Sequence, residues 1–106
     1  MMDEYIDIDK NEIPYAFEME LAGEIFEFEV NYNHAHDFFT LDLFKNGGAL
    51  VVGEKLVLNR PLFQNRTSIE LPKVQIIPKD RANSATRITY DNLNETVFLY
   101  VGETDG

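Results

Sequence analysis

The chain has 106 residues, 44% of them hydrophobic, with no cysteine and a formal net charge of −10. This is the length of one ordinary domain with enough apolar material for a core, and the absence of cysteine excludes disulfides, zinc–thiolate sites and iron–sulfur clusters. The acidic charge argues against nucleic-acid binding, the acidic first ten residues do not resemble a signal peptide, and no apolar run approaches the ~20 residues of a membrane helix.

The negative charge is concentrated at the start of the chain. Residues 1–30 hold ten acidic residues against the single base Lys10, whereas the remaining 76 residues hold nine acidic and eight basic residues. Such a distribution is typical of a solvated acidic surface or of a surface that meets a basic partner.

The first elements expected along the chain are two strands of a hairpin, at 16–21 (AFEMEL) and 25–30 (IFEFEV), because apolar and acidic residues alternate in both. Ala22-Gly23 lies between them and has the length of a two-residue hairpin loop, in which the glycine can take a positive φ.

This loop fixes the register of the hairpin. It sets Phe17 opposite Phe28 on an apolar side, and Glu18 opposite Glu27 on a side that we expect to be wholly acidic. The sequence therefore predicts an acidic surface that is a candidate protein interface, made of Glu18, Glu20, Glu27 and Glu29.

The period of two continues to the end of the chain. Further short strands are expected at 38–44, 49–52, 55–58, 74–77, 87–90 and 96–101, with a turn at 45–48 and a polar loop over 79–85. No helical apolar stripe is present. We therefore predict an all-β fold, a single small antiparallel barrel or sandwich of seven to eight short strands.

The domain is expected to span residues 1–106, with residues 1–12 left open as a flexible or partner-bound N-terminal arm. The alternation places the centre of the core at Phe17, Met19, Phe26, Phe28, Phe39, Leu41, Leu43, Val97 and Leu99.

Both histidines of the chain lie two residues apart, as His34-Ala35-His36-Asp37. On a strand, this spacing would point both imidazoles to one face, where a transition metal could be bound in a cupin-like site with Asp37 or Asp42 as a further ligand. The cupin pattern requires a glutamate four or five residues after the pair, where this chain has Thr40 and Leu41, and a third histidine, which the chain lacks. The surrounding asparagines and the aspartate favour a polar loop between two strands instead.

Catalytic chemistry finds little support in the sequence. The serines, Ser68 and Ser84, do not lie in a Gly-x-Ser-x-Gly elbow. The glutamate pair Glu18 and Glu27 has the residue types of a glycosidase, but an exposed strand face offers no pocket that would shift a pKa. We expect no catalytic residue and no cofactor.

A resemblance adds to this interpretation. The run DFFTLDLFKNGGALVVGEKLVLNRPLF, at 37–63, resembles the central segment of the small baseplate plug proteins of contractile-tailed bacteriophages and prophages, and the flanks at 13–33 and 91–101 agree with it. The resemblance implies a structural, non-enzymatic protein of the virion tail baseplate, near the axis where tube, hub and spike meet, which is in the host cytoplasm during assembly. Its expected partners are other tail or baseplate proteins, with a second copy of itself as a further option.

Two readings of function remain open at this stage. One is a structural baseplate component that acts through protein–protein contacts, without nucleic acid or membrane. The alternative is a free-standing small β-barrel that binds a metal or small molecule through His34 and His36.

Overall fold

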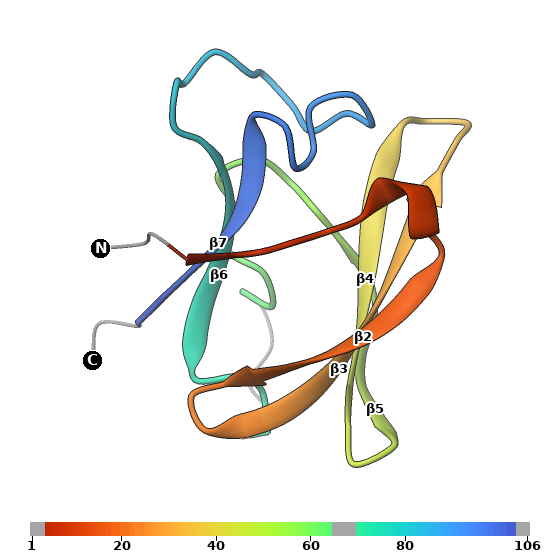
Figure 1. Ribbon diagram of the computed structural model, residues 1–106, viewed down its shortest axis with the longest axis vertical. Coiled ribbons are helices and arrows are strands. Elements are labelled where there is room, and N and C mark those ends of the chain that lie inside the picture. The colour runs from red at the N-terminus through yellow and green to blue at the C-terminus, as the bar shows by residue number, and fades with distance from the viewer. Residues whose placement is uncertain (1–3, 65–69, 104–106) are drawn as a thin grey trace.

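The computed structural model describes residues 4–64 and 70–103 and consists of two antiparallel sheets that face each other (Figure 1). One sheet has the strand order β1-β7-β6 and the other the order β2-β3-β4-β5. The strands are β1 (Glu4–Ile6), β2 (Tyr15–Leu21), β3 (Glu24–Asn33), β4 (Phe38–Lys45), β5 (Gly48–Lys55), β6 (Val74–Asp80) and β7 (Val97–Glu103). The predicted all-β fold is confirmed, as a sandwich rather than a closed barrel.

Helical structure is nearly absent from the described ranges, where the single 3₁₀ turn Lys10–Glu12 is the only helical element. It is capped by the carboxylate of Asp9, which accepts a hydrogen bond of 3.0 Å from the backbone N–H of Asn11. No helix in this part of the chain is long and apolar enough to cross a membrane.

The β2–β3 hairpin has the register that its sequence predicts. Phe17 lies opposite Phe28 and Glu18 opposite Glu27. The two loop residues, Ala22 and Gly23, have φ values of 52° and 82°. Positive φ at both positions matches the twist of the flanking strands, which explains why a two-residue loop closes this hairpin.

The core lies between the two sheets, and both contribute to one hydrophobic cluster. Seven of the nine predicted core residues are at most 1% exposed: Phe26, Phe28, Phe39, Leu41, Leu43, Val97 and Leu99. The other two, Phe17 and Met19, pack against the cluster but are only partly buried. They lie on β2, which is an edge strand of its sheet and therefore leaves one flank of each side chain uncovered.

Two expected strands are absent, and hydrogen bonding explains both. The segment 55–58 was expected to be separate, but β5 continues to Lys55 because Gly53, at φ 75°, forms a bulge whose N–H donates to Asp42 Oδ1 at 2.7 Å. The segment 87–90 is a loop that leads into a turn beginning at Tyr90. The amide of Thr89 bonds to the side chain of Asn92 at 2.8 Å, which takes the place of a strand ladder.

The N-terminal segment, for which the sequence allows a flexible or partner-bound arm, is part of the three-stranded sheet over Glu4–Ile6. There, Tyr5 lies opposite Tyr100 on β7. Ile6 and Ile8 are 1% and 2% exposed. Their spacing of two places both side chains on the core side, which anchors the segment.

The polar loop after β6 is organised by Asp80, the one buried charged residue among those described. Its carboxylate accepts hydrogen bonds from the amides of Ala82, Ser84 and Ala85 and from the hydroxyl of Ser84, at 2.8–3.1 Å. These donors, with the Ala85 amide first, hold the pKa of Asp80 below its usual value, so the carboxylate stays charged although it is buried.

Candidate interaction surfaces

The predicted acidic surface lies on the outer side of the four-stranded sheet. Glu18, Glu20 and Glu27 are exposed and Glu29 is half-buried. Across the described ranges, no ion pair or hydrogen bond reaches any of these four carboxylates; Lys45 pairs with Glu24 and Arg87 pairs with Asp37. The four like charges are therefore not neutralised within the described part of the domain.

The sequence did not show the full composition of this surface. The strand register adds Asp42, which lies opposite Glu29, and Phe44, which lies opposite Glu27. Ile25 shares the surface and is 59% exposed, so the expectation of a wholly acidic side was wrong. We call the set Glu18, Glu20, Glu27, Glu29 and Asp42 the acidic face. The outward direction of the Ile25 side chain could have been predicted from the sequence, because Ile25 comes one residue before the inward-facing Phe26.

The two histidines lie in the turn 34–37 between β3 and β4, as the loop interpretation predicted, and both are exposed. The ring of His34 stands edge-on to Tyr32 at 4.7 Å, and the ring of His36 lies over Phe38 at 6.5 Å. In the described segments, no group of three histidine, aspartate or glutamate side chains is placed to hold a metal ion.

The carboxylate of Asp37, the residue next to the histidines, is used to join two loops. Its Oδ1 accepts from the hydroxyl of Tyr32 at 2.7 Å and from the amide of Tyr90 at 2.9 Å, and its Oδ2 accepts from the guanidinium of Arg87 at 3.0 Å. The Tyr32 hydroxyl is the first of the causes that lower the pKa of Asp37, and the same bond raises the pKa of Tyr32 to about 12. Asp42, the other proposed ligand, accepts the Gly53 amide.

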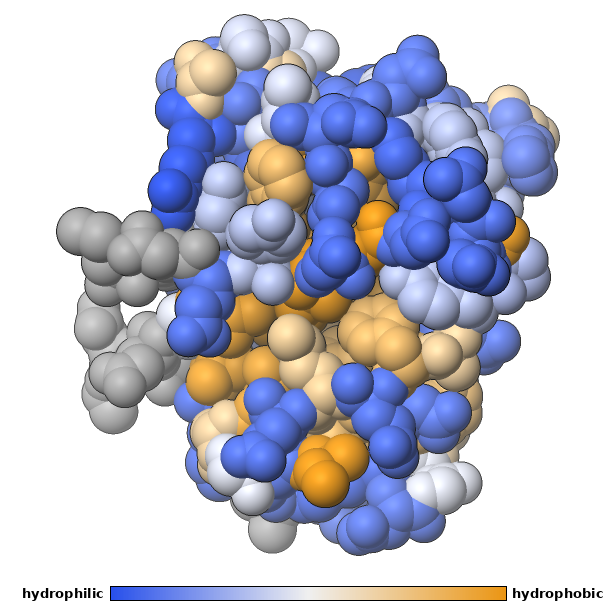
Figure 2. Space-filling model, in the orientation of Figure 1, coloured by the Kyte–Doolittle hydropathy of each residue, from blue (hydrophilic) through white to orange (hydrophobic). Residues whose placement is uncertain are grey.

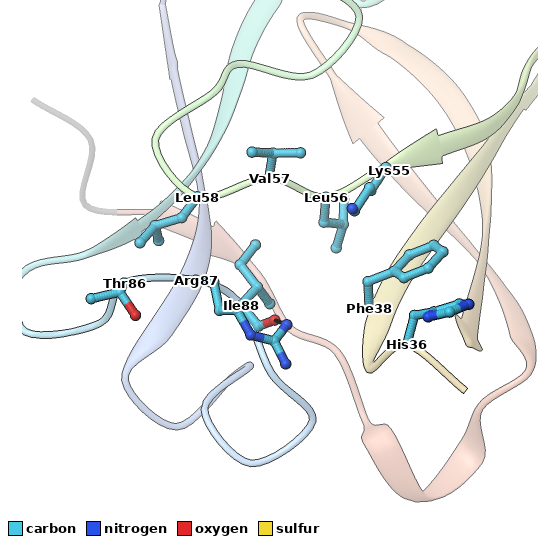
Figure 3. A pocket seen from close by; sticks show the side chains of 9 residues that line it. All are labelled: His36, Phe38, Lys55, Leu56, Val57, Leu58, Thr86, Arg87 and Ile88. Carbon is cyan, nitrogen blue, oxygen red and sulfur yellow. Dashed lines mark hydrogen bonds between the residues drawn. The ribbon is translucent and has the colours of Figure 1, made fainter. Parts of the chain in front are cut away.

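A groove of about 440 Å³ lies beside this turn, between the end of β5 and the segment 86–88 (Figure 3). Its cationic and imidazole groups are Lys55, Arg87 and His36, and its apolar wall is made by Phe38, Leu56, Val57, Leu58 and Ile88. Figure 3 shows Lys55 reaching toward Phe38, and its ammonium lies 4.6 Å from the centre of that ring.

This groove has the size of a ligand site, but its chemistry does not indicate catalysis. Arg87 is already bound to Asp37, and no carboxylate or serine lines the groove. Of the two serines weighed as nucleophiles, Ser84 donates its hydroxyl to Asp80, and Ser68 lies outside the described residues.

The outer side of the other sheet carries aromatic rings that sequence reasoning did not single out. Tyr5 is 44% exposed, and its ring lies 4.6 Å from Phe98 and 6.3 Å from Tyr100. The guanidinium of Arg81 lies 4.4 Å from the ring centre of Tyr100. The outward direction of these rings could have been predicted, because Phe98 and Tyr100 alternate along β7 with the core residues Val97 and Leu99, although Tyr100 is itself buried, at 6% exposed. The two outer sides of the sandwich thus differ, one acidic and the other aromatic.

Comparison with known proteins adds one finding to this geometry. A protein-family model described as "Cyanophage baseplate Pam3 plug gp18" matches residues 4–104, nearly the whole chain. No curated protein matches the chain. The match confirms the resemblance to baseplate plug proteins seen in the sequence, and it spans both sheets and both outer surfaces.

Proposed function

Because the chain belongs to the family of the cyanophage baseplate Pam3 plug gp18, we propose that it is a non-enzymatic structural component of a phage or prophage tail baseplate. In this role it sits plug-like near the axis of the tail and acts through protein–protein contacts. The hub, spike and tube proteins are its proposed partners. It occupies the baseplate of the virion and the host cytoplasm during assembly.

The observation that carries this proposal is the un-neutralised acidic face. Glu18 lies directly opposite Glu27 on adjacent strands, and like charges in this position destabilise a sheet. No ion pair among the described residues reaches them. A basic surface on a baseplate partner would do so. Complementary charge of this kind acts mainly on the rate and orientation of association.

The apolar residues of the same surface fit this role. Ile25 and Val52 are 59% and 67% exposed. A protein interface combines apolar contact area with a charged rim, and exposed aliphatic side chains among carboxylates supply both.

The test replaces Glu18, Glu20, Glu27 and Glu29 together by glutamine and measures binding to each purified hub, spike and tube protein at low and high salt. We expect the affinity to fall about tenfold or more at low salt, and the difference to shrink as salt screens the charges. A matched control changes four exposed acidic residues away from the acidic face: Glu4, Glu12, Asp91 and Glu95.

The control variant has the same net charge as the test variant. If both lose affinity equally, net charge rather than the acidic face drives association, and the proposal is wrong. It is also wrong if the acidic-face variant binds every partner as well as the parent protein does.

A further inference from the structure

The two sheets have four edges, formed by β1, β6, β2 and β5, and an open edge presents unpaired N–H and C=O groups. The edge of β6 is covered by the segment that follows β5. The amide of Asn59 donates to the carbonyl of Pro78 and the amide of Leu62 to the carbonyl of Ile76, both at 2.8 Å. This edge is therefore occupied.

Two further edges carry features that oppose pairing. The register of β5 against β4 shifts twice, between Leu41 and Leu43 and between Leu43 and Phe44, and the amide of Gly53 is turned to the carboxylate of Asp42. Bulges of this kind bend an edge away from a partner strand. β1 is short over the described residues, with three, and a short edge strand offers little to pair with.

β2 has none of these features. It has seven residues and pairs with β3 in continuous register from Tyr15 to Leu21. The two-residue loop makes Leu21 and Glu24 the closing hydrogen-bonded pair, so the N–H and C=O groups of Ala16, Glu18 and Glu20 point away from β3. Among the described residues, no further backbone hydrogen bond reaches this strand.

The side chains along this edge are also incompletely covered. Tyr15, Phe17 and Met19 face the core but stay half-buried. Figure 2 shows apolar side chains gathered in the middle of this view of the molecule, over the space between β1 and β2 in Figure 1. A strand added beside β2 would cover the open flanks of these three residues.

We infer that the open edge of β2 receives an extended segment of another protein, which joins the four-stranded sheet as a fifth, antiparallel or parallel strand. The segment alternates apolar residues, facing inward beside Phe17 and Met19, with basic residues facing outward beside Glu18 and Glu20. Backbone hydrogen bonds supply affinity in this mode of recognition, and the alternating side chains supply specificity.

The acidic charge selects against a second copy of β2 as the occupant. An antiparallel pair of two β2 strands that kept the apolar side chains on one face would bring the Glu18 and Glu20 rows of both copies side by side. Like charges across neighbouring strands are destabilising. The inference rests on the proposed function in that the segment belongs to a baseplate partner, and it specifies how that partner binds.

The first experiment uses the full chain and a synthetic peptide of the length of β2, with lysine alternating with valine or phenylalanine. A control peptide has the same composition with the lysines in one block. Amide hydrogen exchange is measured by NMR with each peptide. We expect the alternating peptide to bind about tenfold more tightly and to slow exchange at Ala16, Glu18 and Glu20. Equal binding by both peptides, or protection confined to other strands, would overturn the inference.

Two variants test the edge of β2 in different ways, so that a folding defect in one of them does not decide the result. Glu18→Pro removes an outward-facing N–H, which an edge strand tolerates, and should abolish binding of the alternating peptide. The double variant Glu18→Lys, Glu20→Lys keeps every backbone group and should reject the lysine peptide while binding a glutamate version of it. If both variants bind the lysine peptide like the parent, the edge is not the site.

The same variants separate this inference from the proposed function. Full binding of the hub, spike and tube proteins by the glutamine variant of the acidic face contradicts the proposed function. Retained binding by Glu18→Pro, with the glutamine variant impaired, contradicts only the strand-addition mode.

Discussion

The hydroxyl of Tyr32, on β3, donates a 2.7 Å hydrogen bond to Oδ1 of Asp37, in the turn that follows the same strand. The bond favours the charged carboxylate and the neutral phenol, so it lowers the pKa of Asp37 and raises that of Tyr32 to about 12. Because Asp37 also binds the amide of Tyr90 and the guanidinium of Arg87, this one carboxylate ties the β3–β4 turn to the segment before β7.

The first prediction concerns acid stability. A carboxyl whose pKa is lowered by folding contributes stability above its unfolded value, near 4, and that contribution is lost as the pH falls through the lower folded value. Replacing Tyr32 by phenylalanine removes the largest cause of the shift. Urea unfolding between pH 2 and 6 should therefore show a smaller loss of stability with acid than in the parent.

The matched control is Tyr90→Phe. It removes a neighbouring hydroxyl that contacts the Lys10 carbonyl at 3.4 Å and leaves the Tyr90 amide on Asp37. Its acid profile should follow that of the parent. An unchanged profile for Tyr32→Phe would show that the other donors alone hold the Asp37 carboxylate in its charged form.

A prediction at high pH follows from the same bond. A group whose pKa is raised by folding contributes stability below its unfolded value, near 10, and loses it as the pH rises through the folded value, here about 12. The parent should lose stability between pH 10 and 12 more steeply than Tyr32→Phe. Equal slopes for the two proteins would mean that a group other than Tyr32 causes the loss of stability at high pH.

A further prediction compares two stacked phenylalanines of the β2–β3 hairpin that differ in burial. Phe28 is 0% exposed, whereas Phe17, stacked on it at 5.5 Å, lies half-buried on the edge strand. Phe28→Ala should lower the free energy of unfolding by about 3–5 kcal/mol, because it leaves a closed cavity. Phe17→Ala should lower it by less than about 2 kcal/mol, because water reaches the site. Denaturant titration compares the two, and equal losses would mean that β2 is covered in solution.

The β2–β3 hairpin was predictable from sequence because two kinds of local information agreed. Alternating phenylalanine and glutamate sets the faces, and the two-residue Ala22-Gly23 loop sets the register. A shift of one residue would have put Glu18 in the core. The loop position of His34 and His36 was predictable for a similar reason, because asparagine and aspartate favour turns.

The remaining features depend on contacts between segments far apart in sequence. Nothing near Gly53 indicates that its amide will find the side chain of Asp42 and carry β5 onward as a bulge. The segment 87–90 has strand-forming residues, but hydrogen bonds to Asp37 and Asn92, on either side of it in the sequence, hold it as a loop. β1 pairs with β7, which lies more than 90 residues later in the sequence. The alternation of residues within each segment does not indicate which strands pair.

The histidines provide a prediction about metal. Replacing His34 and His36 together by alanine should leave the melting temperature nearly unchanged with zinc or with chelator, since both side chains are exposed and each imidazole lies against a neighbouring aromatic ring. Differential scanning calorimetry and metal analysis of the purified protein give the readout. A stoichiometric metal that is lost in the double variant would support the cupin-like alternative.

The last prediction concerns the stability of the acidic face in the isolated protein. Changing Glu18, Glu20, Glu27 and Glu29 to glutamine removes the repulsion between Glu18 and Glu27 and between their neighbours. We expect the melting temperature to rise by about 1–3 °C at low ionic strength, and the gain to shrink at high salt, where the parent's charges are already screened. Thermal unfolding of both proteins across a salt series measures this. A variant less stable than its parent would mean that these glutamates are paired within the domain, in contrast to the structure, where Arg87 binds Asp37 and Lys55 lies over Phe38. A gain that persisted at high salt would point to side-chain packing rather than charge, and the acidic face would then have no electrostatic cost for a basic partner to relieve.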